Sequence, residues 1–178
     1  MTVSALILAG GKATRMGGVD KSALVVEGRT IFERQLAALG TLPVIVSAPR
    51  DVPGFTTVRD VAEGAGPLAG IAAGLAAATT PWLLVLAGDM PYLTAEIIDR
   101  LVSRTSDDID AVGVRLAGLP EPLVCVLRVS VFLPLVRDRL ARGDLKASRM
   151  LTEGDARVAW LDETDARAFF NVNLPADL

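Results

Sequence analysis

The sequence predicts an α/β protein: a three-layer sandwich with a mostly parallel, Rossmann-like central sheet. Short apolar segments alternate with segments of helical periodicity along the 178 residues. Two apolar segments, Ser4–Ala9 and Trp82–Ala87, are hydrophobic on both faces, as central parallel strands covered by helices would be. The length is that of one domain, so we expect residues 1–178 to form a single domain.

The remaining elements are predicted from strand-like runs and helix caps. Thr30 and Glu33 form a capping box that opens a helix through Leu39, and Gly40 ends it. Thr94 is expected to cap a helix to about Ser103, and Ser130 one to about Arg142. Other helices are expected over Leu68–Ala78 and Lys146–Leu151, and other strands over Pro43–Ser47, Thr56–Val58, Ala111–Val114, Leu123–Arg128 and Arg157–Leu161.

Composition excludes several classes of function. The net charge of −3 is spread along the chain, which argues against nucleic acid or an anionic membrane as a partner. Cys125 is the single cysteine, so there is no disulfide framework and a cytoplasmic location is expected. The sequence contains no histidine, which removes His-based acid–base chemistry, Ser-His-Asp triads and His metal sites. No run approaches the roughly 18 apolar residues that span a membrane.

The first predicted strand ends in a glycine-rich loop that contains several cations. Gly10 and Gly11 follow the strand directly, and Arg15 and Lys21 lie further along the loop. Paired glycines allow a close backbone approach to a ligand, and successive N–H groups can hold anions. The spacing fits neither a Walker A loop nor a dinucleotide-binding fingerprint. The loop indicates a nucleoside triphosphate site, with a glycine-rich surface turn as the alternative interpretation.

A second loop follows the buried strand Trp82–Ala87 and contains Asp89 between Gly88 and Pro91. A carboxylate held at the end of a buried strand is a suitable ligand for Mg²⁺, which bridges to substrate phosphates. Ligands in parallel sheets bind beyond the carboxyl ends of the strands, where both loops are expected. The alternative is that Asp89 only begins a turn.

Three further features are candidates for binding. Gly66 and Gly70 open the small-residue helix and would leave room for a ligand at its N-terminus, or would only allow close packing at an ordinary helix start. Asp60, at a strand end, could accept hydrogen bonds from a base or a ribose, or be a solvated loop carboxylate. Asn171 and Asn173 alternate near the C-terminus and could fix a phosphate, a metal-bound water or a pterin edge, although they could also form a turn before a proline.

These motifs together resemble those of the molybdenum cofactor guanylyltransferase (MobA) family. They are Leu-Ala-Gly-Gly-x-x-x-Arg-Met-Gly-Gly-x-Asp-Lys, Gly-Pro-Leu-Ala-Gly, Asp-x-Pro and Asn-x-Asn-x-Pro, in this order from Leu6 to the C-terminus. The resemblance implies a single nucleotidyltransferase domain of glycosyltransferase-A-like, nucleotide-diphospho-sugar transferase-like fold. It also implies transfer of GMP from GTP to molybdenum-bound molybdopterin, with release of diphosphate and with Mg²⁺ as cofactor.

The resemblance also assigns roles to individual residues. Backbone of Leu8, Ala9 and Gly10, with Gly11 beside them, would bind the guanine nucleotide. Arg15 and Lys21 would contact the triphosphate, Asp60 the nucleoside, and Asp89 both the nucleotide and Mg²⁺. Asn171 and Asn173 would lie beside the metal and the pterin, with Lys146 a weaker match for the pterin phosphate. Transient contacts with molybdopterin-carrying proteins or molybdoenzymes are implied as well.

Three positions depart from the family pattern. Ser47 stands where an Asn that touches the nucleotide is frequent, so that contact would be shortened or lost. Gly88 replaces a frequent Cys, which we expect to matter little because Asp89 supplies the ligand. Glu121 precedes Pro122 where His or Gln is common, and its charge would repel an anionic pterin phosphate.

Several alternative functions remain open on the sequence. A molybdopterin cytidylyltransferase is the nearest, although such enzymes favour Leu-Ala-Ala-Gly where this chain has Leu-Ala-Gly-Gly. A nucleotidyltransferase for a sugar 1-phosphate or a phospholactate comes next. A non-catalytic nucleotide-binding adaptor is a third alternative, and the presence of Arg15, Lys21 and Asp89 argues against it.

Overall fold

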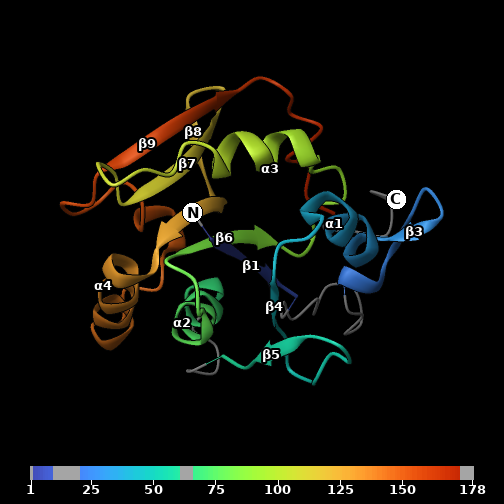
Figure 1. The fold of residues 1–178 in the computed structure, drawn as a ribbon, viewed down its shortest axis with the longest axis horizontal. Coiled ribbons are helices and arrows are strands. Elements are labelled where there is room, and N and C mark those ends of the chain that lie inside the picture. Colours follow the sequence, from blue (N-terminus) through green and yellow to red (C-terminus); the bar gives the residue numbers. More distant parts are fainter. Residues whose placement is uncertain (1, 10–20, 61–65, 173–178) are drawn as a thin grey trace.

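The computed structural model describes residues 2–9, 21–60 and 66–172, and within them the chain forms a seven-stranded sheet between two layers of helices (Figure 1). The strand order is β5-β4-β1-β6-β8-β7-β9. β8 is antiparallel to both of its neighbours, whereas all other pairings in this sheet are parallel. The prediction of a mostly parallel α/β sandwich is confirmed. The bounds of the strands are β1 Val3–Leu8, β4 Val44–Ser47, β5 Thr56–Val58, β6 Trp82–Ala87, β7 Ala111–Leu116, β8 Leu119–Arg128 and β9 Val158–Glu163.

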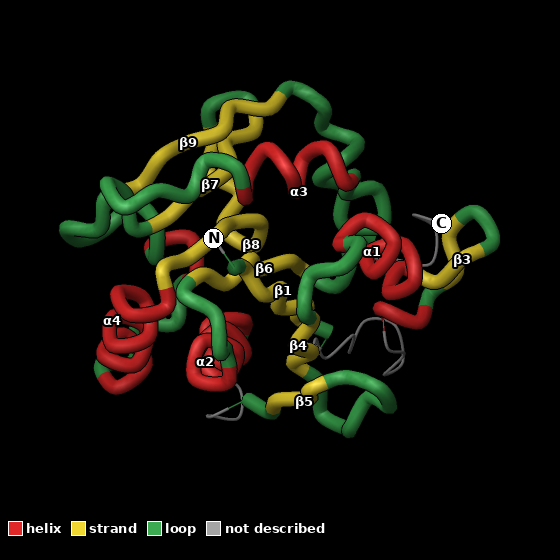
Figure 2. Tube along the Cα trace, viewed as in Figure 1, coloured by secondary structure: helices red, strands yellow, loops and turns green. Residues whose placement is uncertain are grey.

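The central strands β1 and β6 are buried on both faces, as their uniform hydrophobicity predicts. Side chains alternate across a strand. In β1, Ala5 and Ile7 therefore pack into one hydrophobic core, while Leu6 packs into the other. The first core includes residues of α1 (Ile31–Leu39) and α3 (Ala95–Val102), and the second includes residues of α2 (Pro67–Ala77) and α4 (Val129–Ala141). The two helix layers lie on opposite sides of the sheet (Figure 2).

The predicted helix caps of α1 and α3 are confirmed. Thr30 and Glu33 form the reciprocal capping box of α1, and Gly40 ends the helix with a φ of 61°. The Thr94 hydroxyl accepts a hydrogen bond from the Ile97 N–H at the start of α3. Pro67 lies in the first turn of α2, where its missing N–H costs no helical hydrogen bond. A small hairpin of β2 (Val25–Val26) and β3 (Arg29–Thr30) precedes α1, and a 3₁₀ turn, η2 (Lys21–Ala23), precedes the hairpin.

Several of the predicted elements differ from the structure. β8 begins at Leu119, before Pro120 and Pro122, because β6 pairs with β8 only from Val124 onward and leaves the proline-containing part free of that ladder. α4 begins at Val129 and has no side-chain cap from Ser130; the Val129 N–H instead donates to the Pro81 carbonyl. The short helix expected over Lys146–Leu151 is only a 3₁₀ turn, η3 (Ala147–Arg149). No helix in the described part of the chain is long and apolar enough to cross a membrane.

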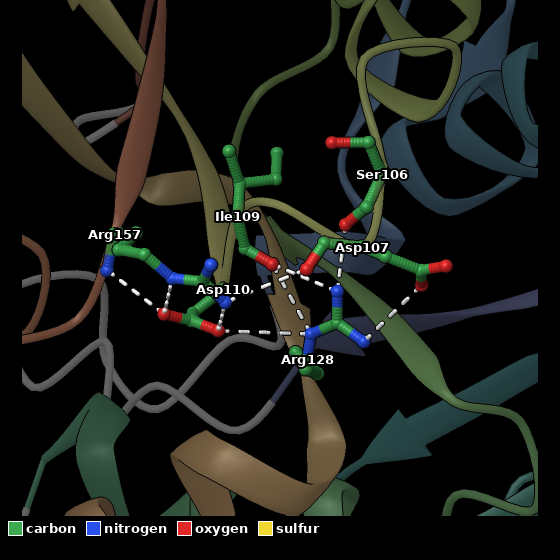
Figure 3. Close-up of polar contacts among 6 residues, drawn as sticks. All are labelled: Ser106, Asp107, Ile109, Asp110, Arg128 and Arg157. Atoms are coloured by element: carbon green, nitrogen blue, oxygen red, sulfur yellow. Dashed lines mark hydrogen bonds and ion pairs between the residues drawn. The ribbon is translucent and has the colours of Figure 1, made fainter.

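Asp110 and Arg128 join the segments that lead into β7 and out of β8 (Figure 3). The Arg157 guanidinium donates to both Asp110 carboxylate oxygens, at 3.0 and 2.9 Å. Arg128 donates to the carbonyls of Ser106 and Ile109 and stacks on the Trp82 ring. The hydrogen bonds from Arg157 lower the pKa of Asp110 from its ordinary 3.8 to about 2. This network lies at the end of β6 opposite to Asp89, so we assign it a structural role.

We expect Asp110 to make the protein sensitive to acid. Because its pKa is lower in the folded than in the unfolded chain, its contribution is complete above about pH 4 and is lost as the pH falls from 3.8 toward 2. Asp110→Asn should therefore be less stable than the wild type at pH 7, with the difference vanishing near pH 2. Urea unfolding of both proteins across this pH range measures the difference in stability. A difference that stays constant with pH would contradict a stabilising role for the ionised Asp110.

Candidate functional site

The candidate site lies where β1 and β6 end side by side. Leu8 pairs with Ala87, and the Gly88 N–H then donates to the Leu8 carbonyl at 3.1 Å. A Cβ on Gly88 would lie 2.6 Å from that carbonyl oxygen and 3.1 Å from the Ala9 Cα. Gly88 therefore matters for the close approach of the two loops, whereas the expectation that its replacement of Cys matters little for the ligand stays a prediction. The two loops approach each other this closely only because Gly88 has no side chain.

Asp89 is half-buried in the loop after β6, and this loop receives the C-terminal segment. The Asp89 carbonyl accepts a hydrogen bond of 2.9 Å from the Val172 N–H. Val172 is itself anchored in a small apolar cluster with Val26 and Ile31. Asn171 is consequently held next in sequence to the residue that contacts the Asp89 loop. The structure thus brings together Asp89 and the Asn171 segment, which are 82 residues apart in the sequence.

Asp60 lies close to the ends of β1 and β4. The Ser47 hydroxyl, at the end of β4, is 3.3 Å from an Asp60 carboxylate oxygen and donates to it. A Cβ on Gly70 of α2 would be 2.7 Å from that hydroxyl, 3.0 Å from the Leu8 side chain and 3.3 Å from Asp60. Gly70 therefore makes room for protein side chains, rather than only for a ligand. Ser47, the departure noted in the sequence, orients Asp60.

Glu121 on β8 faces the Asp89 loop. Leu86 lies opposite Val124 in the antiparallel ladder of β6 and β8. Asp89 follows Leu86 by three residues and Glu121 precedes Val124 by three, so both lie beyond the same end of this ladder. Burial raises the pKa of Glu121, a hydrogen bond from the Leu123 backbone opposes this, and the negative charge of Asp89 raises the pKa further. The carboxyl groups of Asp89 and Glu121 therefore face each other at this edge of the site.

Replacing Glu121 tests this electrostatic arrangement. Because its pKa is higher in the folded than in the unfolded chain, ionisation of Glu121 destabilises the protein as the pH rises above 4.5. Glu121→Gln should therefore raise the melting temperature of the metal-free protein at pH 8, with little difference at pH 4. An equal rise at both pH values would show that the gain comes from packing instead.

Several residues singled out in the sequence lie outside the described residues. They are Gly10, Gly11, Arg15 and Asn173. Lys21 is the first residue of η2, and its side chain is not among those described. Leu8 and Ala9, the start of the glycine-rich loop, are described and lie directly beside Gly88. The expected contacts of these residues with a nucleotide remain predictions.

Sequence reasoning missed Gln35, a residue of α1 whose side chain contacts the Asp89 loop. Its side-chain amide nitrogen donates to the Ala87 carbonyl at 2.6 Å and to the Met90 carbonyl at 3.2 Å. The signal in the sequence is a polar residue on the inward face of α1, four residues from both Ile31 and Leu39.

A pocket of about 500 Å³ lies beside this site without including Asp89 or Asp60. Arg34 and Arg167 both stack on the Tyr92 ring there, and both form ion pairs with Glu27 at 3.2 Å. These charges are satisfied within the protein. We therefore assign the pocket residues to the support of the Pro91–Thr94 segment rather than to the chemistry.

The donor set fits a hard divalent cation that is shared with a substrate. No group of three His, Cys, Asp or Glu side chains suited to a metal ion is found among the described residues. Asp89, with the Glu121 carboxyl facing it, would instead provide one or two carboxylates for a divalent cation whose other ligands are phosphates and water. Cys125 is fully buried, and burial raises the pKa of its thiol far above the usual range, so thiol chemistry is excluded.

The fold and the two converging loops define a nucleotidyltransferase-like site, and comparisons with known proteins give the family. The profile of the MobA-like NTP transferase domain matches residues 5–158, and the chain belongs to this family of nucleotidyltransferases. A molybdenum cofactor guanylyltransferase of Polynucleobacter asymbioticus is 32% identical over 99% of this chain and 94% of that protein. A probable molybdenum cofactor guanylyltransferase of Natronomonas pharaonis is 34% identical over 97% and 93%.

Solved structures agree with the fold. Molybdopterin-guanine dinucleotide biosynthesis protein A from Archaeoglobus fulgidus has a TM-score of 0.77 and 22% identity, over 99% of this chain and 94% of that one. The 2-C-methyl-D-erythritol 4-phosphate cytidylyltransferase from Thermus thermophilus has a TM-score of 0.71 and 22% identity, over 99% and 95%. One fold therefore serves proteins named for different nucleotides, so the fold alone does not fix the base.

Proposed function

We propose that residues 1–178 form a single nucleotidyltransferase domain that transfers GMP from GTP to molybdenum-bound molybdopterin. The products would be the guanine dinucleotide form of the cofactor and diphosphate. The observation that carries the proposal is the convergence of the Leu8–Ala9 loop start, Asp60 and Asp89 at the carboxyl ends of adjacent parallel strands. The names of the curated relatives support guanine and molybdopterin as the substrates.

Each candidate residue has a role in this proposal. Backbone from Leu8 through Gly11 would bind the guanine nucleotide, and Asp60, oriented by Ser47, would accept hydrogen bonds from the nucleoside. Arg15 and Lys21 would neutralise the triphosphate. Asn171 and Asn173 would position the pterin or water around the metal.

The reaction needs positioning and charge neutralisation more than acid–base catalysis. A terminal phosphate oxygen of molybdopterin attacks the α-phosphorus of GTP, forming one P–O bond while the bond to the diphosphate oxygen breaks. This nucleophile is already anionic at neutral pH, so the absence of histidine removes nothing that the reaction requires. Arg15 and Lys21 would stabilise the charge that develops on the diphosphate.

Enzymes of this kind typically need a divalent metal ion, and we propose Mg²⁺ held by Asp89. When bound, it would withdraw charge from the phosphate oxygens of GTP. The Glu121 carboxyl beside Asp89 supports a cation at this edge of the site. Transient contacts with molybdopterin-carrying proteins or molybdoenzymes would deliver the acceptor and remove the product.

A nucleotide panel tests the proposed function. GTP, CTP, ATP and UTP are each supplied with Mg²⁺ and molybdenum-bound molybdopterin, and diphosphate release is measured. We expect release with GTP well above the other three, and none without the pterin. Preference for CTP would make the protein a cytidylyltransferase, and binding of GTP without any release would make it an adaptor.

A further inference from the structure

We propose that Gln35 is a positioning residue for the transfer reaction: its side-chain amide holds the backbone on both sides of Gly88–Asp89. The inference rests on the proposed role of Asp89 and extends it to a residue of α1 that contacts no substrate. It also explains why a polar side chain occupies the core-facing surface of this helix.

Gln35 lies where an apolar residue would be expected. Ile31, Gln35 and Leu39 are the buried positions of α1, and the exposed fraction of Gln35 is 1%. Burying an amide costs free energy unless its polar atoms find hydrogen-bond partners. A leucine or methionine would fill the same space without that cost, so the amide requires an explanation other than packing.

Both amide hydrogens of Gln35 are used on the loop that contains Asp89. The Nε2 atom is 2.6 Å from the Ala87 carbonyl oxygen and 3.2 Å from the Met90 carbonyl oxygen. These carbonyls belong to the residues immediately before Gly88 and immediately after Asp89. The Gln35 side chain therefore holds the backbone on both sides of Gly88 and Asp89, which sets the direction of the Asp89 carboxylate.

The orientation of the amide is determined by its surroundings. A carbonyl oxygen can only accept hydrogen bonds, so the amide nitrogen has to face the two carbonyls and the oxygen has to point away. The Gln35 Oε1 atom is buried and has no hydrogen-bond partner among the residues that the structure describes. An unsatisfied buried oxygen is unfavourable for stability, which favours a role for Gln35 in the site over a role in the core.

Gln35 complements two main-chain anchors of the same loop. The Gly88 N–H donates to the Leu8 carbonyl, and the Asp89 carbonyl accepts from the Val172 N–H. Those contacts tie the loop to β1 and to the C-terminal segment. The Gln35 side chain links the loop to α1. A substitution of Gln35 removes these hydrogen bonds and leaves the two main-chain hydrogen bonds in place.

Gln35→Met tests the inference, because methionine has a similar length and no donor. We expect a folded protein whose kcat falls by about 10- to 100-fold, the effect of a small displacement of a catalytic group. The Mn²⁺ concentration for half-saturation in the presence of GTP should rise, and amide exchange should accelerate at residues 88–90 but not in β1. In Gln35→Glu the donor exists only when the carboxyl is protonated, so its activity relative to wild type should recover as the pH is lowered.

Leu39→Ala is the matched control, because the Leu39 side chain packs on the same helix face but cannot form a hydrogen bond to the loop. It should lower stability and leave Mn²⁺ affinity and exchange at residues 88–90 unchanged. If Gln35→Met behaves in the same way, Gln35 is a core residue and the inference is overturned. Mn²⁺ affinity and exchange are read without turnover, so a wild-type protein that fails to transfer GMP would overturn the proposed function and leave this test intact.

Discussion

Asp89→Asn is expected to lower metal-dependent GMP transfer by about 100-fold or more while leaving the fold intact. The substitution keeps the shape of the side chain and removes the negative charge that we propose for binding Mg²⁺. Asp89 lies in a loop whose backbone is held by Gln35 and Val172, so the variant should fold normally. Steady-state kinetics at a series of Mg²⁺ concentrations measures the effect.

Asp99→Asn provides the control for this prediction. Asp99 is exposed on α3, where the same chemical change should alter neither turnover nor the dependence on Mg²⁺. Full activity of Asp89→Asn would move the metal elsewhere, with Asp60 as the next candidate.

Gly88→Ala is expected to have the second largest effect, because its Cβ would lie 2.6 Å from the Leu8 backbone oxygen. Backbone cannot rotate away as a side chain can, so the ends of β1 and β6 would have to separate. We expect a loss of about 1–3 kcal/mol in the free energy of unfolding. We also expect kcat to fall by at least about 10-fold, because the separation displaces Asp89 from the glycine-rich loop. Urea unfolding and steady-state kinetics on the same preparation measure both.

Gly113→Ala separates the two effects. A Cβ there would lie 2.6 Å from the Trp160 ring, so stability should fall, but Gly113 is in β7, two strands away from β6. Its kinetic constants should be close to those of the wild type. The account of Gly88 would be contradicted if Gly88→Ala lost stability and kept its kcat.

The parts of the fold that depend on local signals could be predicted from the sequence. The uniform hydrophobicity of Trp82–Ala87 indicated a central strand, and the Thr30–Glu33 capping box placed the start of α1. The position of β8 between β6 and β7, and its reversed direction, could not be predicted. Strand order depends on pairings between distant segments, and the prolines at 120 and 122 concealed the first half of β8.

The candidate site was predicted to a similar extent. Asp89 and Asp60 were identified because each follows a strand, and the structure places them at the same edge of the sheet. The contact between Ser47 and Asp60 and the proximity of Gly88 to Leu8 could not be predicted. They depend on the exact separation of neighbouring strands and loops, which a sequence pattern does not encode.

The fate of the α-phosphate of GTP decides whether the protein transfers GMP to the pterin. The protein is incubated with Mg²⁺, molybdenum-bound molybdopterin and GTP labelled at the α-phosphate, and the pterin product is isolated and its mass determined. We predict that the label joins the pterin as GMP, with one diphosphate released for each GMP transferred. Label that remains in GTP or appears as free GMP, or transfer that occurs from CTP instead, would contradict the assignment as a molybdenum cofactor guanylyltransferase.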